Sequence, residues 1–177
     1  LGYLSLVEGG IGSAVTYRLY KPIVEKNYKK LGEMQNGTKM IFSVIILIII
    51  VLGLGTGFII PSLIKNNTFS IPFIVTNFLI YIISEILLYT TVFQRSMFIA
   101  TESTYKLNRI VKSTLIIKGI LEIIIAIITK DITCVLIMFV IINAISNLIV
   151  KKIGKKEFYY IEKTEKKDFS VIKDVKN

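Results

Sequence analysis

Polar side chains recur every fourth residue within the otherwise apolar stretch at residues 71–93: Asn77, Tyr81, Glu85 and Tyr89, with Ser84 beside them. Residues four apart lie on one face of an α-helix, so these side chains form a single polar stripe if the stretch is helical. A carboxylate facing lipid costs about 2.5 to 3.5 kcal/mol or more, so the stripe must face other helices or a water-filled cavity. Two roles remain open: hydrogen bonding between helices, or a transport path on which Glu85 takes up a proton or a cation.

Two further acidic residues, Glu8 and Glu122, lie within apolar stretches. Like the stripe, they are candidates for lining a cavity or coupling transport to an ion. Lys118 precedes Glu122 by four residues on the same helical face, so we expect these two side chains to form an ion pair inside a helical bundle. That pairing is the structural alternative to a role in transport.

Amide, hydroxyl and small residues suggest close contacts between helices. Asn143, Ser146 and Asn147 lie within the last apolar stretch, where hydrogen bonds to a neighbouring helix are the first expectation and a cavity the second. Gly53 and Gly57 lie four apart, a spacing that lets helices approach closely in a membrane. Bending of this glycine-rich helix during transport is the alternative interpretation.

The composition excludes most catalytic chemistry. The 177 residues include no histidine and one cysteine, Cys134, so the chain cannot form an internal disulfide, a histidine-dependent nucleophile system or a usual zinc site. No G-x-x-x-x-G-K-[ST] phosphate loop is present. We therefore predict no catalytic residues, no metal and no cofactor, and a protein that is not an enzyme.

The apolar stretches have the length of membrane spans. Residues 40–63, MIFSVIILIIIVLGLGTGFIIPSL, are 24 consecutive uncharged positions, enough helix at about 1.5 Å per residue to cross a hydrocarbon layer roughly 30 Å thick. Sixteen of them are Ile, Leu, Val or Phe, which favours insertion by about 5 to 10 kcal/mol. The sequence predicts an all-α, polytopic transmembrane helical bundle over residues 1–150, with spans at about 1–17, 40–63, 71–93, 113–129 and 132–150.

The basic residues alternate with these spans. Six lie within residues 18–39, five within 95–118 and nine from residue 151 onward, whereas two lie elsewhere, Lys65 and Lys130. Lys and Arg concentrate in cytoplasmic segments of membrane proteins, so the three basic segments are predicted to be cytoplasmic and the two short hairpins external. The same rule accounts for the net charge of +10 without a nucleic-acid partner.

Residues 151–177 mix lysines with acidic residues and lack sustained periodicity. We interpret them as a cytoplasmic, Lys-rich linker or tail, with binding to anionic lipid as an alternative. The chain begins with leucine inside an apolar stretch, so we expect a piece of a longer protein.

Residues 1–31, LGYLSLVEGGIGSAVTYRLYKPIVEKNYKKL, resemble the second span and following cytoplasmic loop of bacterial polysaccharide-export flippases, which belong to a superfamily with multidrug and toxin exporters. The matching positions are Glu8, Gly10, Gly12, Ser13, Ala14, Leu19, Tyr20, Lys21 and Pro22. Residues 89–111 resemble the end of the family's fourth span, with Arg95 at its basic position and Ala100 at its small one. Glu102 and Ser103 depart from the family's more usual Asp-Gln.

This resemblance implies a fragment covering about the second to sixth spans of a two-lobed transporter in the bacterial cytoplasmic membrane. Such a protein moves polyprenyl-diphosphate-linked oligosaccharide across the membrane for capsule, O-antigen or exopolysaccharide biosynthesis. Its partners are the bilayer, the lipid-linked oligosaccharide and the remainder of the transporter chain. Arg18, Lys21 and Arg95 are the candidates for attracting the diphosphate, and fixing the topology is the alternative role for each.

Three other functions remain open from the sequence. One is a non-transporting membrane scaffold, against which the polar stripe argues, because a scaffold has no need to bear its cost in lipid. A multidrug or toxin exporter of the same superfamily would carry small cations instead of a sugar lipid. An integral membrane enzyme of polysaccharide assembly is less consistent with the chain, because such polymerases usually need a long external loop and neither predicted hairpin exceeds a few residues.

Overall fold

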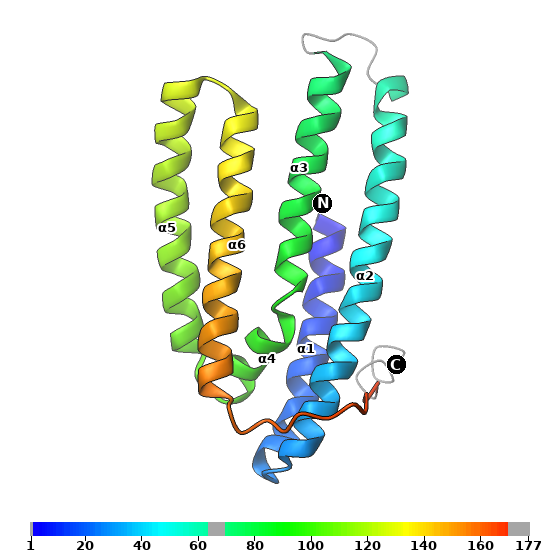
Figure 1. The fold of residues 1–177 in the computed structure, drawn as a ribbon, viewed down its shortest axis with the longest axis vertical. Helices are drawn as coiled ribbons and strands as arrows, with labels where there is room; N and C mark the ends of the chain where they lie inside the picture. Colours follow the sequence, from blue (N-terminus) through cyan, green and yellow to red (C-terminus); the bar gives the residue numbers. More distant parts are fainter. Residues whose placement is uncertain (1, 64–69, 170–177) are drawn as a thin grey trace. The chain divides into compact units, whose positions relative to one another are not determined.

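The computed structural model describes residues 2–63 and 70–169, and gives side chains for residues 11–62 and 70–169. Within these ranges the chain forms six α-helices and no strand, which confirms the predicted all-α class (Figure 1). The helices are α1 (Gly2–Val24), α2 (Tyr28–Leu63), α3 (Ile71–Tyr89), α4 (Val92–Ala100), α5 (Thr104–Thr129) and α6 (Ile132–Glu157). The predicted external connection at Lys65 lies outside the described residues.

Three helices in the described part of the chain are long and apolar enough to cross a membrane: α2, α3 and α6. Their apolar side chains are largely exposed, as Phe58 in α2 shows with an exposed fraction of 83%. Large apolar side chains open to the surroundings on long helices are typical of surfaces that contact lipid. The sequence predicts five spans, and that α1 and α5 also cross the membrane stays a prediction.

The structure shortens the predicted span at 71–93. Helix α3 ends at Tyr89, and a turn at Thr90 and Thr91 separates it from α4. The Thr90 hydroxyl donates to the Leu87 carbonyl over 2.8 Å, so a threonine side chain competes with the backbone for helix bonding there. Thr91 has a φ of −121° and a ψ of 9°, outside α-helical geometry, and its side chain is fully buried. Length and hydropathy alone do not reveal this break.

The chain divides into two compact units. The first unit combines the described parts of Leu1–Ser43, Thr91–Ile110 and Ile149–Asn177. Helix α1 packs on α4, where the Ser96 hydroxyl donates to the Gly12 carbonyl over 3.4 Å. The core of this unit is apolar and draws on every segment of it: Val15, Leu19, Leu31, Met34, Met97, Phe98, Val150 and Phe158.

A tight turn joins α1 to α2 in the first unit. Lys26 has a positive φ of 53°, its amide donates to the Ile23 carbonyl, and the next amide, that of Asn27, donates to the Pro22 carbonyl. This pair of bonds is a Schellman motif, which satisfies carbonyls at a helix end. Asn27 then caps α2, because its Oδ1 accepts from the Lys30 amide over 3.0 Å.

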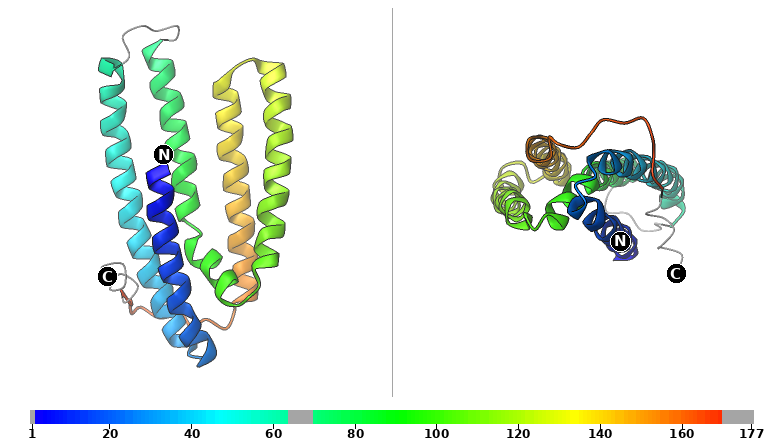
Figure 2. Two further views of the ribbon diagram at one scale, coloured as in Figure 1. Left: turned by 180° about the vertical axis from the view of Figure 1, so that it is seen from behind. Right: turned by 90° about the horizontal axis from the view of Figure 1, so that it is seen from below.

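The second unit combines Val44–Thr90, without its undescribed residues, and Val111–Leu148. It contains α3, the part of α2 from Val44 onward, and the parts of α5 and α6 that form a hairpin, which residues 130 and 131 connect (Figure 2). This confirms the predicted tight connection at Lys130 and Asp131. A Cβ added at Gly53 would lie 2.4 Å from Cδ1 of Ile82, so glycine lets α2 approach α3 closely, as the small-residue spacing predicts.

Candidate functional site

Polar residues of α3 and α6 meet inside the second unit. Asn143 Nδ2 donates to Ser84 Oγ over 2.7 Å, and Asn147 Nδ2 donates to the Leu87 carbonyl over 2.8 Å. Ser84, Ser146 and Asn147 are buried. The prediction that Asn143 and Asn147 hydrogen-bond a neighbouring helix is therefore confirmed. The face of α3 that contacts α6 is therefore the one that contains Ser84.

The predicted stripe on α3 lies half-buried or buried along its length. The side chains of Tyr81 and Glu85 interact with each other, one helical turn apart. Asn77 Nδ2 donates to the Phe73 carbonyl of its own helix over 2.8 Å, while its buried Oδ1 has no partner among the described residues. The transport roles of Asn77, Tyr81 and Glu85 stay predictions.

Lys118 and Glu122 of α5 form the expected ion pair, with 3.6 Å between Nζ and Oε1. The same ammonium group lies 3.5 Å from the ring centroid of Phe139 in α6, a cation–π contact that adds to the neutralisation of its charge. Both contacts lie within the second unit. Glu122 thus has a structural partner, and its role in ion coupling remains a prediction, as does that of Glu8, whose side chain lies outside the described ones.

A pocket of about 660 Å³ lies in the first unit, and we name it the basic pocket. Its lining residues are Tyr17, Arg18, Tyr20, Lys21, Pro22, Glu25, Asn27, Lys30, Met34 and Asp168. Two of the three residues predicted to attract a diphosphate, Arg18 and Lys21, therefore share one hollow. The third, Arg95, does not line it and donates from Nε to Thr91 Oγ1 over 3.1 Å.

The predicted site residues do not include Lys30, which lines the basic pocket. Lys30 lies in the first turn of α2, after the turn at Lys26. In the sequence it is one of six Lys and Arg residues between positions 18 and 39. A count of charge per segment cannot distinguish a lysine that lines a pocket from one that faces solvent. Only the reversal of the chain at Lys26 brings Lys30 to the same pocket as Arg18 and Lys21.

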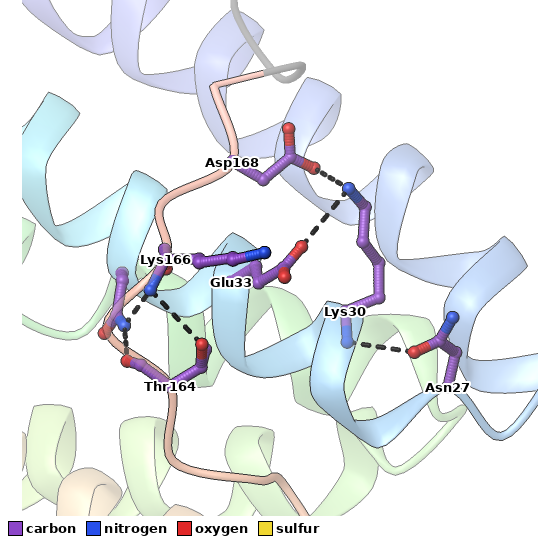
Figure 3. A network of polar contacts seen from close by, with 7 residues as sticks. Asn27, Lys30, Glu33, Thr164, Lys166 and Asp168 are labelled. Carbon is purple, nitrogen blue, oxygen red and sulfur yellow. Dashed lines mark hydrogen bonds and ion pairs between the residues drawn. The ribbon is translucent and has the colours of Figure 1, made fainter.

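Residues 158–168 follow α6 as a turn and an irregular segment that lies along the start of α2, and we name them the strap. Figure 3 shows the end of the strap, from Thr164 to Asp168. Its backbone amides donate to α2 at two places, from Glu162 to the Tyr28 carbonyl over 3.3 Å and from Asp168 to the Glu33 carbonyl over 3.1 Å. The side-chain amide of Asn36 donates to strap carbonyls between these two places. Residues 151–157 of the predicted tail thus belong to α6, and the strap that follows has specific partners on α2.

Two glycines of α2 make room for the strap. A Cβ at Gly32 would lie 2.0 Å from the Glu162 carbonyl oxygen, and a Cβ at Gly37 would lie 1.9 Å from that of Asp168. No side chain fits at such distances from backbone atoms, so both positions require glycine while the strap is docked. Aromatic contacts fix the beginning of the strap, where the ring centroids of Tyr28 and Tyr160 lie 4.9 Å apart.

An ionic contact closes the end of the strap against the basic pocket. Lys30 Nζ lies 3.0 Å from Asp168 Oδ2 and 3.6 Å from Glu33 Oε2 (Figure 3). Lys30 remains 43% exposed, whereas Asp168 is 13% exposed. The acidic partner of this pair is therefore the more enclosed one, and the lysine still faces the pocket.

The described helices and their outward apolar side chains define a multi-pass α-helical membrane protein, by helix length and hydropathy. Its polar contacts between α3 and α6 lie inside the second unit, and the first unit contains a pocket lined by three basic residues. No family model, no characterised protein and no solved structure matches this chain.

Proposed function

We propose that the chain is part of a flippase that moves polyprenyl-diphosphate-linked oligosaccharide across the bacterial cytoplasmic membrane for polysaccharide biosynthesis. The observation that carries the proposal is the basic pocket, which brings Arg18 and Lys21 together with Lys30. Arg18 and Lys21 were already the candidates implied by the resemblance of residues 1–31 to flippases.

The chemistry of the basic pocket suits a sugar diphosphate. Arginine and lysine donate charge-assisted hydrogen bonds to phosphate oxygens, and arginine can do so with two parallel bonds. Tyr17 and Tyr20 add exposed aromatic rings with hydroxyl groups to the same hollow, which suits the mixed apolar and polar surface of a sugar. A volume of about 660 Å³ falls in the usual range for a pocket that takes a small organic group.

The apolar surface of the second unit suits the other half of such a substrate. Leu52 of α2 and Ile128 of α5 are 65% and 75% exposed. A polyprenyl chain is as apolar as the lipid tails that such side chains contact, so it can stay in the bilayer while its head group is bound.

The proposal is tested in cells that depend on the full-length protein for surface polysaccharide. Deletion is expected to abolish surface polysaccharide and to leave the lipid-linked oligosaccharide on the inner leaflet, as measured by its accessibility to a membrane-impermeant glycosidase. Replacement of Arg18 and Lys21 by glutamine is expected to reduce rescue at least tenfold, because two positive charges that attract the diphosphate are lost. The matched control is Lys29→Gln, which removes an exposed lysine that does not line the pocket.

The acidic residues of the basic pocket favour a second candidate, a multidrug or toxin exporter. Glu25 and Asp168 line the same hollow and are the groups that a small organic cation would contact. Efflux of a cationic dye from proteoliposomes, together with normal surface polysaccharide after deletion, would support the exporter and contradict the flippase.

A further inference from the structure

We propose that Lys30 is a phosphate-binding residue of the basic pocket and that Asp168, at the end of the strap, competes with the phosphate group for it. The inference deepens the proposed function, because it adds an internal competitor to the site where the diphosphate is bound. It predicts that a phosphate-bearing ligand releases the end of the strap, and that the docked strap weakens the binding of that ligand.

Lys30 lines the basic pocket while its ammonium group is paired with carboxylates. Its ammonium group contacts the Asp168 carboxylate at 3.0 Å and lines the pocket together with Arg18 and Lys21. A lysine ammonium carries three donors, so it can contact a carboxylate and a phosphate, but the phosphate brings further negative charge next to Asp168. Repulsion between the two anions therefore opposes simultaneous binding.

Asp168 also holds the end of the strap on α2 through its own backbone. The same residue that pairs with Lys30 donates its amide to the Glu33 carbonyl, and its carbonyl oxygen lies against Gly37. Withdrawal of the carboxylate from Lys30 pulls on both contacts. The strap also has anchors further back, at Glu162 on Tyr28 and at Asn36, so its end can open while its beginning stays docked.

Strap docking and phosphate binding at Lys30 are thermodynamically linked. If the docked strap lowers the affinity of the pocket for phosphate by some factor, the bound phosphate lowers strap docking by the same factor. An ion pair as exposed as that of Lys30 contributes modestly, so removal of the Asp168 charge is expected to raise phosphate affinity by about threefold. Binding of a phosphate-bearing ligand and removal of the Asp168 charge must therefore both weaken docking of the strap.

The experiment uses the full chain in nanodiscs of zwitterionic lipid. The probes are farnesyl diphosphate in the bilayer, inorganic pyrophosphate in solution and phosphatidylglycerol as a general anionic lipid. Binding is measured by titration, and strap docking by hydrogen exchange of the Asp168 and Glu162 amides, both of which are bonded to α2. A response to farnesyl diphosphate identifies a lipid-borne diphosphate, a response to pyrophosphate alone a free one, and a response to phosphatidylglycerol a general lipid head group.

Four substitutions separate competition from damage to the fold. Asp168→Asn keeps the shape and is expected to raise affinity about threefold and to speed exchange at position 168. Gly37→Ala displaces the strap without changing charge and should raise affinity as well, whereas Lys30→Gln should lower it severalfold. The matched control is Gly119→Ala, because a Cβ there meets nothing within 4 Å, and it should change neither quantity.

The competition is overturned if Asp168→Asn and Gly37→Ala leave affinity unchanged or lower it, or if no probe speeds exchange at position 168. Its failure is distinguishable from failure of the proposed function. Normal flipping of oligosaccharide by the Asp168→Asn variant, with unchanged probe affinity, overturns the competitor and leaves the flippase in place. Competition with phosphatidylglycerol or pyrophosphate in a protein that flips no oligosaccharide supports the competitor and contradicts the flippase.

Discussion

Asn143 on α6 donates a hydrogen bond of 2.7 Å to the hydroxyl group of Ser84 on α3. Ser84 is 1% exposed, whereas apolar residues on the same helices, such as Ile83 and Ile141, are about half exposed. A water-soluble domain buries its apolar side chains and exposes its polar ones. The second unit does the reverse along these helices, as a protein surrounded by lipid must.

The contact between Asn143 and Ser84 leads to a stability prediction. Asn143→Leu removes the donor and leaves the buried Ser84 hydroxyl without this partner, so we expect a loss of about 0.6 to 1.7 kcal/mol in the free energy of unfolding. The change is measured by unfolding the purified protein in mixed micelles with increasing amounts of a denaturing detergent. The double variant with Ser84→Ala should recover part of the loss, and full additivity of the two substitutions would contradict the bond.

Gly32 is predicted to be essential for docking of the strap. Gly32→Ala places a Cβ 2.0 Å from a backbone oxygen, which cannot move independently of the strap, so the strap should detach. Limited trypsin digestion should then cut at Lys163 and Lys166 at least tenfold faster than in the parent protein. Gly55→Ala is the matched control on the same helix, because its Cβ has open space, and equal cleavage of both variants would refute the close approach.

The turn at Lys26 offers a stabilising substitution. The backbone there has a φ of 53°, in the left-handed region that glycine adopts without steric penalty. Lys26→Gly is therefore expected to stabilise the first unit by about 0.5 to 1 kcal/mol. A rise in the thermal midpoint measured by circular dichroism checks it, and Lys39→Gly, an exposed position in the interior of α2, should instead lower the midpoint.

The contacts at the end of α6 predict a loss of stability at high pH. The hydrogen bond from Lys106 to Glu157 raises the pKa of Lys106 above 10.5, and burial raises the pKa of Tyr160 above 10.0. A group whose folded pKa is raised contributes its stabilisation below the unfolded pKa and loses it as the pH rises through the folded value. These two groups should thus leave the stability of the first unit unchanged from neutral pH to about pH 10 and lower it above that pH, as measured by denaturation at stepped pH. The Lys106→Gln variant should lose less.

Glu85 is the remaining candidate for ion coupling. Glu85→Gln keeps the size of the side chain that interacts with Tyr81 but cannot release a proton. If Glu85 couples transport to protons, the variant should lose the pH dependence of transport in proteoliposomes. An unchanged rate with an unchanged pH profile would remove Glu85 from the mechanism, while Tyr81→Phe controls for loss of the local contact alone.

Several features of the fold follow from local sequence. The 24 uncharged residues from Met40 determine an apolar helix, because only a helix satisfies every backbone amide within one segment in lipid. The four-residue spacing of Lys118 and Glu122 determines their pairing in the same way, since helical geometry brings positions four apart together. Asn143 and Asn147 could be identified as bridging residues by their polarity, but their partners on α3 could not.

The sequence by itself determined what depends on short-range periodicity: the helical class, the apolar faces, the Lys118 and Glu122 pair, and the polar groups that must avoid lipid. Tertiary structure alone decided the meeting of Lys30 with Asp168 and the need for glycine at positions 32 and 37. The physical reason is that the strap has no repeating pattern of its own. Its conformation is fixed by backbone contacts with a helix far away in the chain, and such contacts leave no local signal in the sequence.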